Sequence, residues 1–273
     1  MSRRRRLSLP RLWANDYVHF AARSPTVGGT FSIRVRSVAA ARRKCQPLIG
    51  WAAILTKAMA LTAGRWPELR QCYMPLPWPH LYEHPCCVAN LVLEREWRGE
   101  QAIFCDQIRA PESISLREID DRLRTMKGAQ IDALGGFRRI IRITGYPLLV
   151  RRLLWSLVLK GSGRLRARYF GTFCVNLLAG RNMHISQSVT LHAISLFHGP
   201  LQPDGIMKLH VFFDHRVIDG ARVARWVADL EATLGRDVVA ELASGLQSQG
   251  QCAGVSRATG CEQPASGVPN VAS

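Results

Sequence analysis

The sequence predicts a two-layer α/β sandwich with a mixed β-sheet. Three observations support this: segments with period-two alternation, helical segments between them, and a turn-rich connection typical of a hairpin. The chain has 273 residues, of which 47% are hydrophobic, which is enough for one large domain. We expect a basic, irregular arm over residues 1–29, the domain over 30–243, and a disordered tail rich in Ser, Gly, Gln and Ala over 244–273.

The first half of the chain contains the strand and helix patterns in alternation. Apolar and polar residues alternate over 30–38, 88–97 and 102–108, which predicts strands, and helical spacing follows Pro47 and Ser115. Arg98-Gly99-Glu100 predicts a turn between the second and third strands. Ser115 and Glu118 have the spacing of a capping box.

Residues 137–168 are both basic and strongly apolar. The run Tyr146 to Trp155 has the composition of an amphipathic helix that lies on a membrane surface. The alternative is a core helix whose arginines extend outward to solvent. We favour the core helix, because Leu and Trp are ordinary core residues.

Three further strand patterns lie at 170–178, 189–197 and 206–213. The last two flank His198-Gly199-Pro200 and Asp204-Gly205, which predict a hairpin connection. After Gly220 the apolar residues recur at helical spacing. Strands interleaved with helices, together with this hairpin, indicate the mixed sheet.

The most informative segment is Asp214-His-Arg-Val-Ile-Asp-Gly-Ala221, at the end of the last predicted strand. A strand that ends in an imidazole, with the Asp219 carboxylate four residues later, is a suitable arrangement for a general base. His215 must then be neutral and held in one tautomer by a carbonyl or carboxylate. A histidine at the end of a core strand is the structural alternative for so short a motif.

The whole segment resembles the active-site signature of the dihydrolipoamide acyltransferases, the catalytic domains of 2-oxo acid dehydrogenase complexes, whose fold is that of chloramphenicol acetyltransferase. The resemblance implies that His215 is the general base and that Asp219 holds the loop by pairing with an arginine, Arg23 or Arg216 being candidates. It also implies a homotrimer with active sites between subunits. Because no segment resembles a lipoyl or subunit-binding domain, we expect a stand-alone relative.

A second family motif, Gly-Thr-Phe-Thr-Ile-Ser-Asn-Leu-Gly, resembles the stretch from Gly171 to Ala179. The resemblance implies that the family's serine stabilises the oxyanion, but Asn176 stands at that position and Cys174 replaces a threonine. Period two places Thr172, Cys174 and Asn176 on one face, where they are candidates for lining a substrate channel. An asparagine amide can donate to an oxyanion. Equally, Asn176 can satisfy a neighbouring backbone group.

The chain is strongly basic, with 37 Lys and Arg against 20 Asp and Glu, and has no acidic residue between Asp132 and Asp204. This charge favours an anionic partner: coenzyme A, an anionic membrane surface or a nucleic acid. We expect no nucleic acid, because the aromatic residues are not interleaved with the basic run. The eight cysteines lack C-x-x-C spacing, so we expect no metal site.

These observations lead to one expected function and one alternative. The expected function is transfer of an acyl group from a thioester, acyl-coenzyme A, to a thiol, hydroxyl or amine, with coenzyme A as a co-substrate and no permanently bound cofactor. The alternative is a catalytically weak trimeric scaffold whose basic face binds an anionic membrane or polymer. Without a secretory signal or a long apolar run, we expect a cytoplasmic protein, peripheral at the membrane under the alternative.

Overall fold

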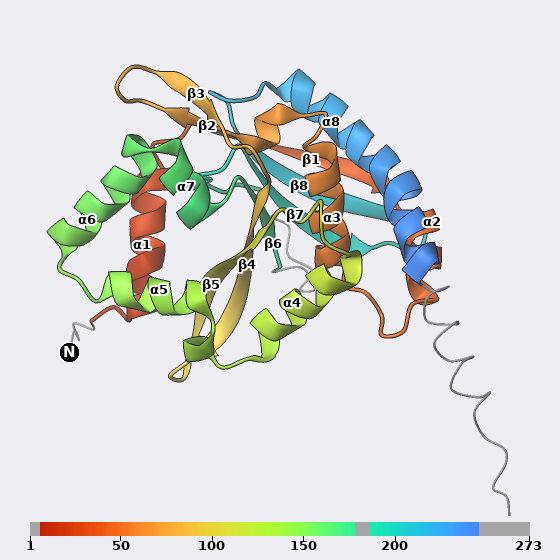
Figure 1. The fold of residues 1–273 in the computed structure, drawn as a ribbon, viewed down its shortest axis with the longest axis horizontal. Helices are drawn as coiled ribbons and strands as arrows, with labels where there is room; N and C mark the ends of the chain where they lie inside the picture. Colours follow the sequence, from red (N-terminus) through yellow and green to blue (C-terminus); the bar gives the residue numbers. More distant parts are fainter. Residues whose placement is uncertain (1–5, 178–185, 246–273) are drawn as a thin grey trace, which may run out of the picture.

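A six-stranded mixed sheet forms the centre of the computed structural model, which describes residues 6–177 and 186–245 (Figure 1). The strand order is β1-β8-β7-β6-β4-β5. β6 runs parallel to β4 and to β7, and the other neighbours are antiparallel. The strands are β1 (Thr26–Arg34), β4 (Val88–Trp97), β5 (Glu100–Arg109), β6 (Phe173–Asn176), β7 (Ile194–Leu201) and β8 (Ile206–Asp214). The predicted mixed sheet is confirmed.

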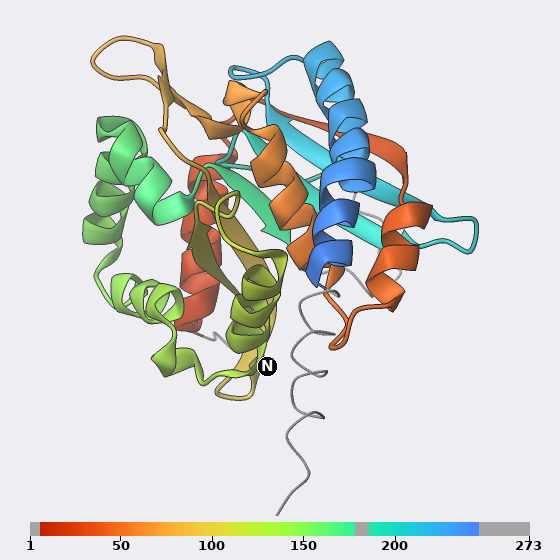
Figure 2. The same cartoon turned by 45° about the vertical axis from the view of Figure 1, so that its right-hand side comes forward.

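One face of the sheet is apolar and is covered by helices. The helices on this side are α3 (Trp51–Thr62), α4 (Leu116–Gly128) and α8 (Gly220–Thr233), with α2 (Arg36–Arg43) and η4 (Leu234–Val238) beside them (Figures 1 and 2). α3 is buried along almost its whole length because it lies between α4, α8 and the sheet. Leu91, Val175 and Leu196, level with one another on β4, β6 and β7, are fully buried on this face.

A second group of helices surrounds the β4–β5 end of the sheet (Figure 1). It consists of α1 (Leu9–Ala21), α5 (Gly135–Thr144), α6 (Leu148–Ser156) with its π-helical extension η3 (Leu157–Gly161), and α7 (Gly163–Phe170). Trp155 of α6 holds these helices together: its ring stacks on that of Phe20 with 5.5 Å between the ring centroids, and its centroid lies 4.8 Å from that of Phe170. Short elements complete the fold: η1 (Pro67–Arg70), the β2 (Gln71–Met74) and β3 (His80–Glu83) pair, and η2 (Ile131–Ala133).

Several local predictions are confirmed. Arg98 and Gly99 have φ of 54° and 77°, as a tight turn between β4 and β5 requires. The Ser115 hydroxyl accepts a hydrogen bond from the Glu118 backbone N–H at 3.1 Å and thereby caps α4. The predicted hairpin joins β7 to β8, and Gly205 takes φ of 85° in its turn.

The N-terminal region differs from the prediction of an irregular arm. Residues 9–21 form α1, which begins after the Ser8 cap, and β1 already starts at Thr26. Trp13 and Phe20 anchor the helix, because both are buried against the second helix group. The expected tail over 244–273 lies mostly outside the described residues. The domain limits 30–243 stay a prediction.

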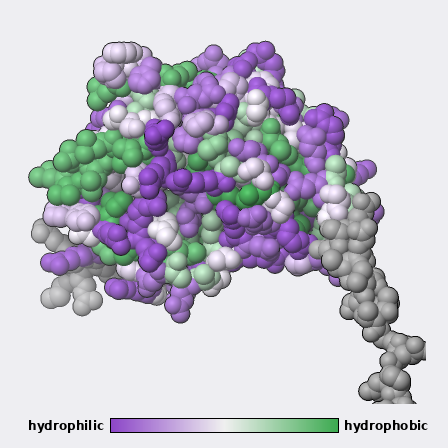
Figure 3. Space-filling model, viewed as in Figure 1, coloured by the Kyte–Doolittle hydropathy of each residue, from purple (hydrophilic) through white to green (hydrophobic). Residues whose placement is uncertain are grey.

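The favoured interpretation of residues 146–155 holds for Trp155, which is buried in the core, but not for Arg151. In α6, Arg151 is buried, whereas Leu148, Leu149 and Leu153 are exposed, Leu149 to 82%. The cause is Asp16 of α1, whose fully buried carboxylate accepts a 2.7 Å hydrogen bond from Arg151 Nε. Pairing this charge turns the helix so that its apolar side faces solvent, where Figure 3 shows a green patch at the left edge.

Candidate active site

His215 is the first residue after β8 and lies on a turn before α8. Its backbone N–H donates to the Pro25 carbonyl at 3.1 Å, which ties the turn to the segment before β1. The side chain is half exposed, and its Nδ1 lies 3.3 Å from Asp219 Oδ1. If Nδ1 carries the proton that faces this carboxylate, the lone pair of Nε2 is free to accept a proton. This is the arrangement that a general base needs.

The carboxylate that holds the turn is Asp214, not Asp219. Asp214 is buried and accepts hydrogen bonds from the Arg216 backbone at 3.0 Å and from its guanidinium at 2.6 and 2.9 Å. Ser24 Oγ donates to the same carboxylate at 2.9 Å. Burial alone would raise the pKa of Asp214, but these hydrogen bonds and the Arg216 charge bring it below its usual value.

Among the described residues, Asp219 forms an ion pair with neither of the two candidate arginines, Arg23 and Arg216. Arg216 is already bound to Asp214 and stacks over the Tyr73 ring at 4.4 Å. Asp219 is 79% exposed, and its backbone caps α8 although its side chain makes no capping bond. Its place beside Nδ1 makes it a candidate to orient the His215 ring. The sequence could not distinguish the two aspartates, because both flank the histidine within four residues.

Asn176 and Cys174 lie on the polar face of β6, as the alternation predicts, and both are buried. The Asn176 amide is 3.4 Å from the Leu196 carbonyl and 3.6 Å from Cys174 Sγ, so part of its donor capacity satisfies neighbouring groups. Burial raises the pKa of the Cys174 thiol to about 12, which makes it an unreactive small residue. Thr172 is occupied differently, because its hydroxyl bonds both backbone groups of Val88.

A cavity of about 490 Å³ opens on this polar face. Cys174 and Asn176 line it together with Tyr17 of α1 and Ser195 of β7. It is of ordinary size for a small-molecule site. Thr172, which precedes β6, is not among its lining residues, so the structure places Cys174 and Asn176 at the cavity and Thr172 beside the start of β4.

The structure does not bring His215 and Asn176 together within one chain. Asn176 is level with Phe197 of β7, which is level with His210 of β8, and His215 follows five residues later. Five residues of strand span about 16 Å, and two strand spacings add about 10 Å across the sheet. The two candidates can therefore act on one substrate only if they come from different chains.

The described residues contain neither a candidate metal site nor a membrane-spanning helix. Among the residues that the structure describes, no group of three or more His, Cys, Asp or Glu side chains is placed to hold a metal ion. Over the same residues, none of the helices combines the length and apolar character needed to cross a bilayer.

Comparison with known proteins supports the resemblance drawn from the motifs. Residues 183–238 match the family model of the 2-oxoacid dehydrogenases acyltransferase (catalytic domain). This segment contains β7, β8, His215 and α8. No curated protein matches the sequence.

Solved structures extend the likeness over most of the chain. Dihydrolipoamide acetyltransferase of Azotobacter vinelandii has a TM-score of 0.65 at 17% identity, covering 89% of this chain and 94% of that one. The cubic core of the pyruvate dehydrogenase multienzyme complex has 0.64, with the same identity and coverage. A truncated catalytic core of the 2-oxoacid dehydrogenase complex of Thermoplasma acidophilum has 0.59 at 15%, covering 86% and 99%. At these identities the likeness shows the fold, and with the family match it confirms the resemblance predicted from the sequence.

Proposed function

We propose that the chain is an acyltransferase that uses His215 as general base and an acyl-coenzyme A thioester as donor. The observation that carries this proposal is the 3.3 Å contact between His215 Nδ1 and Asp219 at the end of β8, within the segment that matches the acyltransferase model. The contact leaves Nε2 available to an acceptor.

The proposed reaction has two steps. Nε2 of His215 takes the proton of the acceptor thiol, hydroxyl or amine as the acceptor atom attacks the thioester carbonyl. The resulting oxyanion then collapses, the bond to the coenzyme A sulfur breaks, and the imidazolium returns its proton to the leaving thiolate. The Asn176 amide is the candidate donor to the oxyanion, since it lines the cavity on the polar face.

The proposed site lies between two chains of a homotrimer. The separation of His215 and Asn176 along and across the sheet supports a site between chains, and the number of three subunits rests on the resemblance to the dihydrolipoamide acyltransferases. In a cyclic assembly, each interface presents one surface of a chain to a different surface of its neighbour, so each active site would combine His215 of one chain with Asn176 of the next.

Thioester turnover tests the catalytic part. His215→Ala should lower the release of free coenzyme A by about 10²–10⁴-fold, the usual contribution of a general base. His198→Ala is the matched control, because His198 is a partly buried histidine of β7 outside the turn. A His215→Ala protein that folds normally and turns over at the wild-type rate would contradict the proposal.

Mixed oligomers test the composite site. His215→Ala and Asn176→Ala chains, each inactive alone, should regain activity when co-expressed, because some interfaces then combine an intact His215 with an intact Asn176. With equal, random mixing about a quarter of the interfaces are intact, so we expect about a quarter of wild-type activity. No recovery above the single variants would place both residues in a site within one chain.

A second candidate function is attachment to an anionic lipid surface, and the exposed apolar side of α6 favours it. Leu148, Leu149 and Leu153 are all more than half exposed on this helix, and the surrounding 133–203 segment has no acidic residue. Apolar side chains beside cations are typical of helices that lie in the membrane interface. Vesicles of phosphatidylserine and phosphatidylcholine should bind the protein, and Leu149→Gln with Leu153→Gln should abolish binding. Binding that survives these changes would exclude α6 as the contact.

A further inference from the structure

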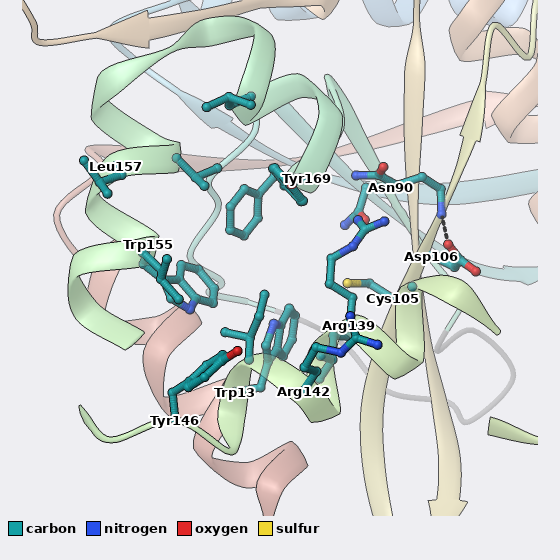
Figure 4. A pocket seen from close by; sticks show the side chains of 18 residues that line it. Trp13, Asn90, Cys105, Asp106, Arg139, Arg142, Tyr146, Trp155, Leu157 and Tyr169 are labelled. Carbon is teal, nitrogen blue, oxygen red and sulfur yellow. Dashed lines mark hydrogen bonds between the residues drawn. The ribbon is translucent and has the colours of Figure 1, made fainter. Parts of the chain in front are cut away.

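A second cavity, of about 540 Å³, lies between the β4–β5 end of the sheet and the helices α5, α6 and α7 (Figure 4). It shares Trp13, Asn90, Cys105 and Phe170 with the cavity beside Asn176, so the two hollows adjoin. Nothing in the proposed acyl transfer uses this space. Its lining has an apolar part and a polar part, and each indicates what would fill it.

The apolar part is made by the second helix group. Trp13, Trp155 and Tyr169 form aromatic walls, and Leu154 and Val158 continue the lining along α6 and η3. Figure 4 shows Trp155 and Tyr146 on the side opposite Arg139. Such a surface binds an aliphatic chain or an aromatic ring by removing its apolar area from water.

The polar part contains atoms whose hydrogen-bonding capacity is unused. Asn90 is 4% exposed, and its Oδ1 is buried without a hydrogen-bond partner. Gln107, directly opposite on β5, has a buried Nε2 that likewise has no partner. A buried polar atom left unpaired costs about 1–3 kcal/mol. A ligand oxygen placed here would remove the cost for Gln107 Nε2.

Two cations stand beside these atoms. Arg139 and Arg142 of α5 line the same cavity, and in the part of the chain that the structure describes neither guanidinium has a carboxylate within ion-pair distance. Arg139 lies over the Tyr169 ring at 5.0 Å, which keeps its charge at the cavity. Guanidinium groups bind carboxylates in two-point contacts.

We propose that this cavity binds a carboxylate with an apolar body, such as a medium-chain fatty acid. The chain lies between Trp13, Trp155 and Val158, and the carboxylate meets Arg139 and Arg142, with one oxygen in reach of Gln107. The proposal does not depend on the proposed acyl transfer, because binding needs neither His215 nor turnover.

Decanoate is the test ligand, with binding measured by titration calorimetry on the full chain. ω-Bromodecanoate serves as a second probe, because bromine quenches tryptophan fluorescence on contact and two tryptophans line the cavity. Decanoate should bind at least about tenfold more tightly than decylamine of equal length, since the two arginines outweigh the single Asp106 carboxylate in the lining and favour an anion over a cation. Equal affinity of the two, or no quenching at millimolar concentration, would overturn the proposal.

Paired variants locate the site. Val158→Phe adds volume inside the cavity and should weaken decanoate binding at least about tenfold, whereas Leu149→Phe, on the exposed side of the same helix, should leave it unchanged. Arg139→Gln with Arg142→Gln should remove the preference for the anion, and Arg138→Gln, next along α5 but outside the lining, is the matched control. If test and control variants of either pair behave alike, the site is not this cavity.

His215→Ala separates this inference from the proposed function. The variant should bind decanoate as the wild type does; loss of binding in a folded His215→Ala protein would contradict the inference. Conversely, normal turnover without decanoate binding would leave the function standing and this inference wrong. Competition with decanoyl-coenzyme A tests whether the free carboxylate is needed. The thioester has no carboxylate for Arg139 and Arg142, so it should displace ω-bromodecanoate at least about tenfold less well than decanoate does, and equal displacement would contradict the proposal.

Discussion

Replacing Asp214 by asparagine tests whether this residue, and not Asp219, holds the His215 turn. The substitution keeps the shape of the side chain and removes the charge that Arg216 and Ser24 now bind. Breaking a buried ion pair costs about 3–5 kcal/mol, because the remaining charge is left without its partner. Arg216 is 31% exposed and can turn toward water, so we expect the lower end, about 3 kcal/mol.

Urea unfolding gives this quantity directly, and the melting temperature provides a second measure. For a domain of this size, 3 kcal/mol corresponds to a fall of about 6–12 °C. Asp219→Asn is the control. Its side chain is 79% exposed, so its free energy of unfolding should change by no more than about 0.5 kcal/mol.

Acid should reproduce the effect of the substitution. Because the folded pKa of Asp214 is lowered, the ion pair stabilises the wild type fully above the ordinary aspartate pKa of about 3.9, and this contribution is lost as pH falls below it. Asp214→Asn should lack that part of the acid sensitivity. Equal destabilisation by Asp214→Asn and Asp219→Asn, or a loss below 1 kcal/mol in the first, would refute the assignment.

Three further changes probe other parts of the fold. Burial lowers the pKa of His192 to about 4, so between about pH 6.5 and 4 the unfolded chain binds a proton that the folded chain does not. The free energy of unfolding therefore decreases as the pH is lowered through this window. His192→Gln should remove up to about 3 kcal/mol of this dependence, measured by urea unfolding at several pH values. Arg151→Met leaves the Asp16 carboxylate buried without its main partner and should cost about 3–5 kcal/mol, so a loss under 1 kcal/mol would show that α6 does not depend on this pair. Gly171→Ala should destabilise the domain by more than 1 kcal/mol, because Gly171 has φ of 84° and an added Cβ would lie 2.7 Å from the Val88 carbonyl; an unchanged melting temperature would contradict this.

Sequence reasoning succeeded where the structure is determined by neighbours along the chain. The alternation in β4, the turn at Arg98 and Gly99, and the Ser115 cap each depend on residues within a few positions. The strand and helix patterns together also predicted the mixed sheet, but not the order of its strands. Sequence reasoning did not find α1 and misjudged which side of α6 is buried, because α1 packs on the second helix group and Arg151 of α6 binds Asp16 of α1, 135 residues away. Periodicity on one helix cannot show that a distant carboxylate will draw its arginine inward.

In the candidate site, too, the sequence predicted what residues close along the chain determine and missed what distant residues determine. The two motifs located His215, Asp219 and Asn176, but spacing could not tell which aspartate binds Arg216, and it could not show that Ser24, from the segment before β1, bonds both Asp214 and Arg216. Nor could it reveal the cavity of Trp13, Arg139 and Trp155, whose walls come from α1, α5 and α6 and meet only through folding.

The arginines of the acid-free stretch have separate roles in the folded protein. Arg151 is used inside the protein to fix α6, while Arg139 and Arg142 remain beside a hollow with unpaired amides. The net charge of the segment therefore does not measure its affinity for an anion. Binding in the hollow depends on the guanidiniums that both lack a carboxylate partner and line it. Substitutions of Arg139 and Arg142, with Arg138 as their control, therefore decide whether this basic region binds a carboxylate ligand.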